Sequence, residues 1–527
     1  MPIDPEKVRA IVATIRTQLT DLEGLTVEPP PPPPPPPTGT TFRVKPGDDL
    51  QAALDQATFG DTILVTPGGY KGKFVLRKKD GTGVIRVRAD VDPGNFTSPK
   101  PWVLPEHAPA MFRLESVDGY SPVLVTEAGA HGFSFQGMDV PPVRPDRDQV
   151  VLGVGADQTT VESIPFGFEF DQCYFHGDPT PGKGQHRGIA AQVIGLTVRR
   201  SCFKDHFEVG RDSQCIAAWN GAGPFVLVDN FLEASGENVM FGGAGISVPD
   251  LVPTDILIQG CHFSKNVDWK THPTPPGVKN LFEIKNGQKV RVVGNLFENC
   301  WKHAQMGYCF MITPSNSTGT MPWVRAHDIV IEYNVIRRVG SLLNVNNGQG
   351  VGPTQGTKGL TFRQNLAYDI NTVNLGDDRM IMLGGGPDQV TIDHNIMLGD
   401  DVPQGYLVLY SDPALHQMDA LKYTNNVARE GSYGLFTEKT SAGGAVGFMA
   451  YSPTGVLQGN VIEQSGVRNW LDHGPGNLKI AKGQLAVQLD SSFRWMPDSP
   501  ASQHPTTDGQ PPGPNITDLL AKMGHLL

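Results

Sequence analysis

A single phrase of hydrophobic and polar positions recurs along most of the chain. It runs apolar, any residue, apolar, two further residues, a position usually held by Asn, any residue and apolar, as in VRVVGNLF and IVIEYNVI. The alternation of period two predicts short strands rather than helices. The position usually held by Asn is occupied in turn by Met138, Cys173, Ser201, Asn230, Cys261, Asn295, Asn334, Asn365, Asn395, Asn426 and Asn460.

These residues, called ladder residues below, follow one another at intervals of 28 to 39 residues. Such a period predicts a solenoid in which each repeat is one supersecondary unit. Asn tolerates left-handed backbone conformations, so we expect these residues in tight turns between strands. Stacking would place six of the asparagines in a ladder whose side-chain amides bond to one another. The pattern therefore predicts an all-β protein, a right-handed parallel β-helix of about 11 to 12 coils.

A second strand comes before each phrase, and these strands also align. Their inward positions are apolar throughout: Ala191, Ala218, Phe241, Ile284, Ile312, Val345, Leu383 and Leu409. Their outward positions form a stripe of Gln192, Trp219, Gly242, Lys285, Thr313, Asn346, Gly384 and Tyr410. Glu283 lies on the same outward face, one strand step before Lys285. Aromatic faces beside hydrogen-bonding side chains suit sugar rings, so the stripe is a candidate glycan-binding groove.

Polar and charged residues gather in the segments that lead into these strands. They are His186, Arg187, Glu208, Arg211, Asp212, Glu237, Asn238, Asp377, Asp378 and Arg379. Because the strands align, we expect these side chains along one edge of the groove. A solvated ion-pair ladder is the alternative for any single residue, but the cluster as a whole favours a binding site.

The N-terminal segment has a different pattern. Residues 5–24 are predicted to form a helix whose apolar positions are spaced as in a coiled coil: Val8, Val12, Ile15, Leu19 and Leu22. The unbroken run Pro29–Pro37 predicts a stiff polyproline stalk. Because so short a helix is marginal alone in water, we expect it to pack against other chains. Residues 1–37 are thus predicted to support a homotrimer or docking into a larger assembly such as a virion.

The predicted organisation has four parts. They are an N-terminal helix at 1–28, a polyproline linker at 29–41, the β-helix at 42–465, and a C-terminal cap and tail at 466–527. The tail is expected to end in a short helix, capped by Thr517, that folds back on the body or on a neighbour.

Composition limits the kinds of binding partner and the location that we expect for the protein. The net charge of −11 argues against nucleic acid, which requires clustered Lys and Arg. No run approaches 18 uninterrupted apolar residues, so no membrane span is expected. The N-terminus lacks the pattern of a secretory signal peptide. The six cysteines form no C-x-x-C pair and are expected to be buried as small hydrophobic residues.

The segment FRVKPGDDLQAALDQATFGDTILV resembles the first coil of the pectin-lyase-like β-helix superfamily. In that superfamily a short amphipathic helix covers the open end of the core; here we expect it at 49–57, capped by Asp48. From about residue 40 onwards the chain is similar to bacterial β-helix proteins of unassigned activity. The layout also resembles that of tailspikes with β-helical bodies.

The segment FEIKNGQKVRVVGNLFENC is similar to alginate and chondroitin-B lyases. This resemblance implies Lys285 as the base that removes the C5 proton of the sugar, with Glu237, Asn238 and Glu283 as ligands of a Ca²⁺ cofactor. Those lyases carry an Arg-His-Gly one coil later, where this chain has AQMGYCFMI. Arg211 or Arg187 would have to take the role of the missing arginine.

Glycoside hydrolysis is a competing chemistry. It requires two carboxylates about 5 to 9.5 Å apart. Because adjacent coils are about 4.8 Å apart, Asp212 with Glu237, or Glu237 with Glu283, would qualify. In either case the expected substrate contacts are Trp219, Gln192, Arg187, Asn346, Tyr410 and Arg379.

Three functions are therefore open at this point. The favoured one is a glycan-recognising and glycan-depolymerising spike, located on a virion or at an extracellular surface. The second is an exported bacterial polysaccharide lyase or glycoside hydrolase. The third is a structural rod with an inert groove, because a β-helix by itself establishes no activity.

Overall fold

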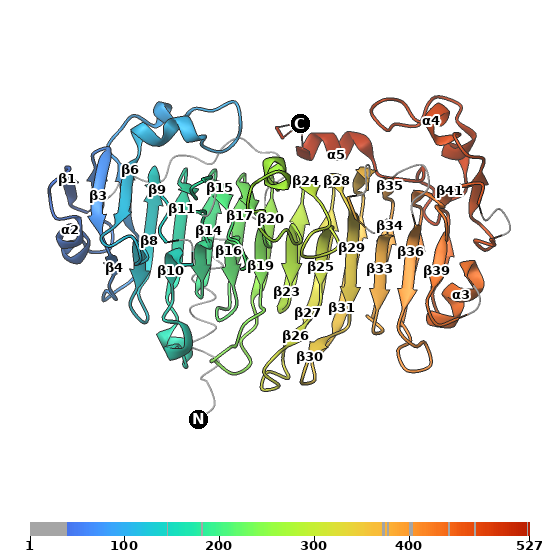
Figure 1. Ribbon diagram of the computed structural model, residues 1–527, viewed down its shortest axis with the longest axis horizontal. Coiled ribbons are helices and arrows are strands. Elements are labelled where there is room, and N and C mark those ends of the chain that lie inside the picture. Colours follow the sequence, from blue (N-terminus) through green and yellow to red (C-terminus); the bar gives the residue numbers. More distant parts are fainter. Residues whose placement is uncertain are drawn as a thin grey trace.

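The protein is a rod of stacked coils, each built from three short strands (Figure 1). The computed structural model describes residues 39–527, except 145, 181–182, 372–374, 377–378, 400–403, 441–442, 468–470, 524 and 527. The predicted N-terminal helix, the polyproline stalk, Asp377 and Asp378 lie outside the described residues. Three long parallel sheets run the length of the rod, so the predicted right-handed parallel β-helix is confirmed.

The first sheet has 14 strands, and consecutive coils supply neighbouring strands. Its strands are β1 (Thr41–Val44), β2 (Thr62–Val65), β5 (Ile85–Ala89), β8 (His131–Gln136), β11 (Phe166–Asp171), β14 (Ile194–Arg199), β17 (Phe225–Val228), β20 (Thr254–Gln259), β23 (Gly287–Val293), β27 (Ala326–Glu332), β31 (Thr357–Arg363), β34 (Thr391–Asp393), β37 (Lys422–Thr424) and β40 (Val456–Gln458).

The second sheet has 12 strands and carries the candidate groove. Its strands are β4 (Phe74–Leu76), β7 (Leu124–Thr126), β10 (Asp148–Leu152), β13 (Arg187–Ala191), β16 (Gln214–Ala218), β19 (Val239–Phe241), β22 (Phe282–Ile284), β25 (Tyr308–Ile312), β29 (Ser341–Asn346), β33 (Arg379–Gly384), β36 (Gly405–Tyr410) and β39 (Leu435–Thr437).

The third sheet has 14 strands, and a short parallel pair of strands stands apart from all three sheets. The third sheet consists of β3 (Gly68–Gly72), β6 (Phe112–Ser116), β9 (Met138–Val140), β12 (Tyr174–His176), β15 (Cys202–His206), β18 (Phe231–Ala234), β21 (His262–Ser264), β24 (Leu296–Cys300), β28 (Val335–Val339), β32 (Leu366–Ile370), β35 (Ile396–Gly399), β38 (Val427–Arg429), β41 (Val461–Glu463) and β42 (Leu478–Ile480). The separate pair is β26 (Ser315–Asn316) and β30 (Gln349–Gly350).

Helix α2 (Leu50–Gln56) lies at one end of the rod, α3 (Gly444–Tyr451) and α4 (Leu485–Gln488) lie at the other end, and α5 (Ile516–Met523) lies along one side (Figure 1). The 3₁₀ helices are η1 (Pro93–Phe96), η2 (Pro105–Ala110), η3 (Gly155–Asp157), η4 (Val161–Ser163), η5 (Val267–Lys270) and η6 (Pro500–Gln503). No helix in the described part of the chain is both long and apolar enough to cross a membrane.

The two terminal helices form as predicted, but with different caps. The side chain of Asp49, not Asp48, accepts the capping hydrogen bond from the backbone of α2. Asn515 takes the place expected for Thr517, because its side chain accepts from the first turn of α5. Each observed cap lies within two residues of the predicted one. The prediction was open to this error because a short polar side chain at either position can reach the free N–H groups of the first turn. Helix α5 folds back on the body, where Lys522 lies over the ring of Tyr333 at 5.2 Å.

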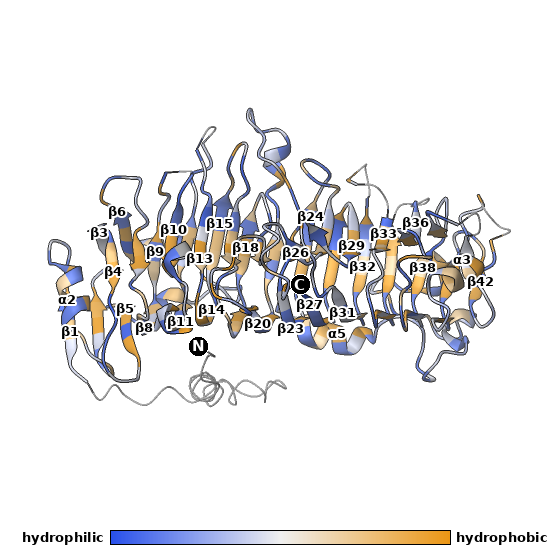
Figure 2. Cartoon of the chain, turned by 90° about the horizontal axis from the view of Figure 1, so that it is seen from below, coloured by the Kyte–Doolittle hydropathy of each residue, from blue (hydrophilic) through white to orange (hydrophobic). Residues whose placement is uncertain are grey.

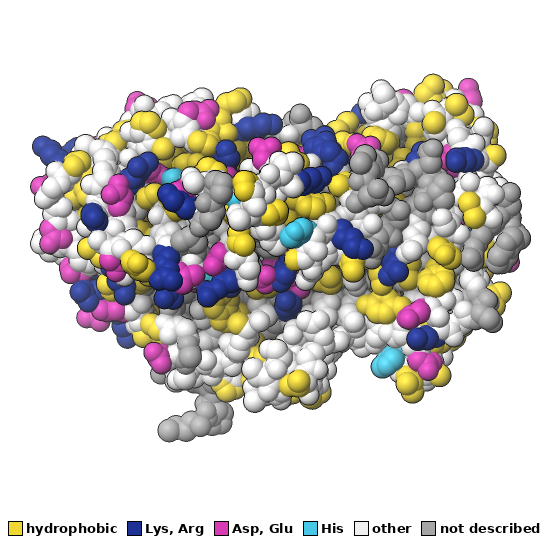
Figure 3. All heavy atoms as spheres, viewed as in Figure 1, with side chains coloured by type: hydrophobic (Ala, Val, Ile, Leu, Met, Phe, Trp, Pro, Cys, Tyr) yellow, Lys and Arg dark blue, Asp and Glu magenta, His cyan; other side chains and the backbone are white. Residues whose placement is uncertain are grey.

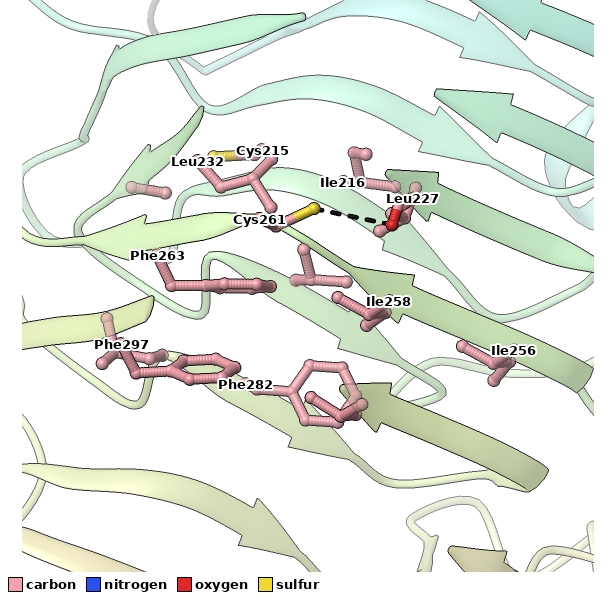
Figure 4. Packing of buried hydrophobic residues seen from close by; sticks show 14 of the residues in the cluster. Cys215, Ile216, Leu227, Leu232, Ile256, Ile258, Cys261, Phe263, Phe282 and Phe297 are labelled. Carbon is pink, nitrogen blue, oxygen red and sulfur yellow. Dashed lines mark hydrogen bonds between the residues drawn. The ribbon is translucent and has the colours of Figure 1, made fainter. Parts of the chain in front are cut away.

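The core lies between the three sheets and is filled by the inward-pointing side chains of their strands. Hydrophobic residues gather in the strands, and hydrophilic residues colour many of the projecting loops (Figure 2). Figure 4 shows the interior at the central coils, where Phe263 and Phe297 stack with ring centroids 4.5 Å apart. The inward column predicted for the second sheet, from Ala191 to Leu409, is completely buried, so that prediction is confirmed.

The asparagine ladder is also confirmed. The side-chain amide of Asn295 donates to Asn334 at 3.0 Å, and the series continues through Asn365, Asn395 and Asn426 to Asn460 at 2.9 to 3.1 Å. Asn477 extends it by one further step of 2.8 Å. Each side-chain oxygen also accepts the backbone N–H of the preceding ladder residue, as Asn334 does from Asn295 at 2.9 Å. These buried amides are therefore satisfied by one another.

One detail of the ladder differs from the prediction. The left-handed residue of each turn is the residue before the ladder residue, not the asparagine itself. Examples are Tyr333 at φ 54°, Gln364 at φ 56° and His394 at φ 50°; glycine holds the same position in other coils. The asparagines of the ladder instead use their side-chain amides to bond along the rod.

Candidate functional site

The candidate site lies on the outward face of the second sheet, over β13, β16, β19 and β22. Phe241 and Ile284 are in register and point inward, so Met240 and Glu283, which are also in register, point outward. Lys285 follows Ile284 and therefore joins the outward side. The strict alternation of a strand thus presents Glu283 and Lys285 to the same face.

A chain of polar contacts connects the coils across this face. Arg187 lies 3.4 Å from Asp148 and donates through Nε to Gln214 at 2.6 Å. Gln214 in turn donates to Glu237 at 2.7 Å. Arg187, Gln214 and Glu237 belong to three successive coils, so the contacts run parallel to the axis of the rod. Of the residues predicted for this edge, Arg187 and Glu237 belong to this network.

Lys279 closes the network on the next coil. Its ammonium lies 2.6 Å from Asp212 and 3.4 Å from Glu237. Burial acts to lower the pKa of Lys279, but Glu237 and Asp212 hold it above its usual value. Lys279 is therefore a fixed cation, partly open to solvent, between an exposed carboxylate and a buried one.

Glu237 and Glu283 form a buried carboxyl pair beneath these cations. Their carboxyl groups are in hydrogen-bond contact, and both residues are almost completely buried. Burial, together with the neighbouring Glu237 charge, raises the pKa of Glu283 to about 7. Burial also acts on Glu237, but Lys279 and Gln214 hold the pKa of Glu237 below its usual value. Glu237 is thus the charged member of the pair and Glu283 is the member that holds the proton near neutral pH.

Lys285 contacts the carboxyl pair from the side of the groove. Its ammonium is 3.3 Å from Glu283, and its side chain is 19% exposed. Asn280 donates to the other oxygen of Glu283 at 3.1 Å. An amine open to the groove is therefore in contact with a carboxyl group that titrates near neutrality, which is the arrangement that proton transfer requires.

Trp219 flanks the network on the N-terminal side. The guanidinium of Arg187 lies over its ring at 5.5 Å. A cavity of about 400 Å³ opens beside Trp219, lined also by Gly155, Ala244, Gly245, Ile246, Ser247, Thr318 and Thr320. Loops from several coils thus place an aromatic face and hydroxyl groups beside the charged cluster.

Charges on this molecule are largely paired. Basic and acidic side chains lie next to one another over the face seen in Figure 3. Arg211, one of the predicted catalytic residues, is 59% exposed and lies 3.8 Å from Glu208. Asp212 is 44% exposed and pairs with Lys279. Of these two, Asp212 belongs to the network, and Arg211 lies at its rim.

Gln192 and Asn238 are predicted site residues that are buried instead. Gln192 is only 3% exposed, and η3 covers it, because Gln158 donates to its carbonyl at 3.1 Å. The Asn238 amide donates to the carbonyls of Leu232 and Ser264. Neither side chain reaches the groove as the structure stands.

Asn346, Tyr410 and Arg379 lie further along the second sheet, away from the charged network. The hydroxyl of Tyr410 donates to Asn344 at 3.3 Å, and its ring covers Gly384, where a Cβ would lie 2.1 Å from the ring. Burial raises the pKa of Tyr410 to about 12. Arg379 donates to Gln404. These residues form a separate polar surface towards the C-terminal end of the groove.

The predicted Ca²⁺ shell does not fit the arrangement of its residues. Asn238 accepts from the ammonium of Lys265 at 2.6 Å, while Glu237 and Glu283 each face a lysine. Ammonium groups therefore take the positions in which a cation would meet these oxygens. Among the described residues, no group of three or more His, Cys, Asp or Glu side chains could hold a metal.

Sequence reasoning missed Gln214, Lys279 and Lys265. Gln214 and Lys279 each flank a predicted residue by two or more positions, and only the stacking of coils brings them to Glu237. Lys279 stands in the same segment as Glu283 and Lys285. Its position in that segment, counted back from the strand, was the one signal that could have predicted it.

Comparison with known proteins adds little beyond the fold. No protein-family model and no curated protein matches the sequence. Solved structures that resemble the chain include a mannuronic acid specific polysaccharide family 6 lyase from human gut microbiota (10% identity, 81% of this chain and 86% of that chain covered, TM-score 0.47). Others are a thermostable GH87 α-1,3-glucanase from Streptomyces thermodiastaticus (13%, 85% and 68%, TM-score 0.42) and the Dettilon tailspike protein (10%, 85% and 69%, TM-score 0.39). Likeness at these levels carries no inference about activity.

Proposed function

We propose that this protein binds an acidic polysaccharide along the second sheet and cleaves it by β-elimination, with Lys285 as the base. The observation that carries the proposal is the position of Lys285. Its amine is open to the groove and in contact with Glu283, a buried carboxyl group with a pKa of about 7. Groups that exchange protons in catalysis are characteristically tuned towards neutral pH in this way.

Elimination on a uronic acid needs three groups. A base takes the proton at C5, a cation stabilises the negative charge that develops on the sugar carboxylate, and a proton reaches the leaving oxygen at C4. The electrons of the C5–H bond form the C4–C5 double bond as the C4–O bond breaks. Lys279, which contacts Glu237 and stands on the same coil as Lys285, is the nearest cation of the network for this role, and Arg187 supplies a second cation further along the groove.

Above its pKa of about 7 Glu283 is a carboxylate, and in that form it accepts a proton from the ammonium of Lys285. The two groups are 3.3 Å apart, and Glu237 carries the negative charge of the pair. Lys285 in its neutral form then removes the C5 proton. When the C5 proton and the leaving oxygen lie on the same face of the sugar, the same amine returns the proton to that oxygen.

Hydrolysis is less well supported by the carboxylates. A pair of glycosidase carboxyl groups stands about 5 to 9.5 Å apart so that a sugar or a water fits between them. Glu237 and Glu283 are in contact with each other and buried beneath lysines, so no sugar fits between them.

Trp219 and its cavity are proposed as a sugar-binding position next to the reacting residue. Its ring supplies an apolar face of the kind on which a sugar ring stacks, and Thr318 and Thr320 supply hydroxyl groups. Residues 1–37 are proposed to anchor the rod as a homotrimer in a larger assembly such as a virion. A non-catalytic rod is the outcome if no glycan is bound or cleaved.

The test uses the full chain and a panel of acidic polysaccharides, with a neutral glucan as the control. β-Elimination cleaves the polysaccharide chain and leaves an unsaturated uronate at one of the new chain ends. The reaction therefore gives a new ultraviolet absorbance together with new reducing ends. New reducing ends without that absorbance would identify a hydrolase, and binding without new ends would identify a recognition protein. Either result would overturn the proposed elimination.

A further inference from the structure

Lys265 is a completely buried lysine that the proposed chemistry does not use. Its ammonium donates to the carbonyls of Ala234 at 2.8 Å, Ser235 at 3.3 Å and Asn280 at 2.9 Å, to the carbonyl of Gly236, and to the side chain of Asn238 at 2.6 Å. An ammonium has only three protons, so these five oxygens share them. A buried charge needs such compensation, because an isolated ion inside a protein is very costly.

The oxygens around Lys265 come from the two segments that carry the carboxyl pair. Residues 234–238 form the turn that contains Glu237, and Asn280 holds Glu283 through its side-chain amide at 3.1 Å. The ammonium therefore ties the Glu237 turn on one coil to the Asn280 segment on the next. Lys279, in the Asn280 segment, also contacts Glu237 through its ammonium at 3.4 Å, but Lys265 bonds to backbone carbonyls of both segments.

The turn itself has no room to move. A Cβ on Gly236 would lie 2.5 Å from the carbonyl oxygen of Ser213 and 2.6 Å from its nitrogen, so this turn packs directly on the preceding coil. Ser235 donates to the carbonyl of His206 at 2.8 Å, and its own carbonyl accepts from Lys279 at 3.0 Å. The side chains of Gln214 and Lys279 hold Glu237 itself, while Lys265 holds the backbone carbonyls of the turn.

We infer that Lys265 is a positioning residue, whose buried ammonium clamps the Glu237 turn against the Asn280 segment and so holds Glu237 and Glu283 in contact. Without this clamp the two carboxyl groups separate, and the repulsion that favours a proton on Glu283 weakens. Burial lowers the pKa of Lys265 to about 8, so the clamp is at full strength below that pH. The inference deepens the proposed function, and it rests on that function only for its kinetic readout.

The test follows the titration of Glu283 itself, which needs no substrate. The protein is labelled with glutamate carrying ¹³C in its side-chain carboxyl group, and Glu283→Gln identifies the resonance. In the native protein the midpoint is expected near 7. In Lys265→Met, which keeps the length of the side chain and removes the ammonium, the midpoint should fall by about one pH unit or more.

Two further variants make the result decisive. Asn426→Ala removes a buried amide from the ladder, far from the site, and should leave the midpoint unchanged although it also destabilises the fold. Gly236→Ala displaces the same turn while keeping the Lys265 side chain, and should lower the midpoint even if Lys265→Met does not fold. If either Lys265→Met or Gly236→Ala folds and keeps the native midpoint, the inference is wrong.

Kinetics separate this role from a purely structural one. If the protein is a lyase, Lys265→Met should reduce kcat by about 10²-fold at a nearly unchanged KM, because a small displacement of catalytic groups has that effect. If the protein has no lyase activity, kcat cannot be compared between the variants. The titration of Glu283 still tests the inference in that case.

Discussion

The ammonium of Lys285 lies 3.3 Å from the carboxyl group of Glu283, on the outward side of the second sheet. Glu283 belongs to β22 and Lys285 directly follows the last residue of that strand, so the alternation of the backbone brings both side chains to the same side. Glu237, on the preceding coil, contacts the same carboxyl group. The stacking of two successive coils therefore brings these three groups together.

The protonation of Glu283 should make stability depend on pH. Its pKa is about 7 in the folded protein, above the ordinary value of 4.5. The folded state thus holds more protons than the unfolded state between these values. Its contribution is complete below about pH 4.5 and is lost as pH rises through about 7, with a slope of up to about 1.4 kcal/mol per pH unit.

Glu283→Gln should flatten that slope in urea unfolding measured from pH 4.5 to 7.5. Part of the slope should remain, because burial also raises the pKa of Glu233 to about 7. Glu162→Gln, at an exposed glutamate, is the matched control and should keep the native slope. A native slope in Glu283→Gln would show that this carboxyl group is not protonated on folding.

Trp219 should contribute to glycan affinity rather than to the chemical step. Trp219→Ala removes the ring beside the cavity and the partner of Arg187, so Kd for an acidic oligosaccharide should rise about tenfold. Calorimetry on the inactive Lys285→Ala background measures this without turnover. Tyr433→Ala, at an exposed aromatic residue near the C-terminal end, should bind as before. Equal affinities of the two variants for the oligosaccharide would show that Trp219 does not contact the glycan.

The asparagine ladder should be a major source of stability. Asn365→Ala removes the side-chain acceptor of the Asn334 backbone N–H and the side-chain donor to the carbonyl of Ile331. We expect a loss of about 3 kcal/mol in the free energy of unfolding, because buried groups without partners are costly. Urea unfolding measures it, with Asn95→Ala in an exposed turn as the control. A loss no larger than in the control would mean that the ladder is incidental.

The anchor proposed for residues 1–37 is tested by subunit mass. Light scattering should give a trimer for the full chain and a monomer for residues 38–527. Substituting Val12 and Leu19 with Glu in the full chain keeps the stalk and should also give monomers, since charge at these apolar positions opposes association. If the full chain is itself monomeric, the anchor does not assemble it.

The repeat made the fold predictable. The constant phase of the ladder residues determined the coil boundaries, and the apolar column from Ala191 to Leu409 determined which side of the second sheet faces the core. These features depend on period-2 alternation and on a fixed repeat, both of which are visible in a single sequence.

The site was only partly predictable, because its contacts cross between coils. Arg187, Asp212, Glu237, Glu283 and Lys285 were found by their position before or on aligned strands. Gln192 and Asn238 had equivalent positions, but the carbonyls they meet, and the turn that covers Gln192, depend on loop conformation. Lys265 carries no sequence signal at all, because its five acceptors come from distant turns.

The most direct measurement compares Lys285→Ala with the native protein on an acidic polysaccharide that the native protein depolymerises. The ultraviolet absorbance of the unsaturated product should disappear in Lys285→Ala, while the thermal unfolding curve stays native, because the side chain points outward. Lys289→Ala, at an exposed lysine of β23, should cleave at the native rate. An active Lys285→Ala protein would contradict the assignment of the base, and with it the central claim.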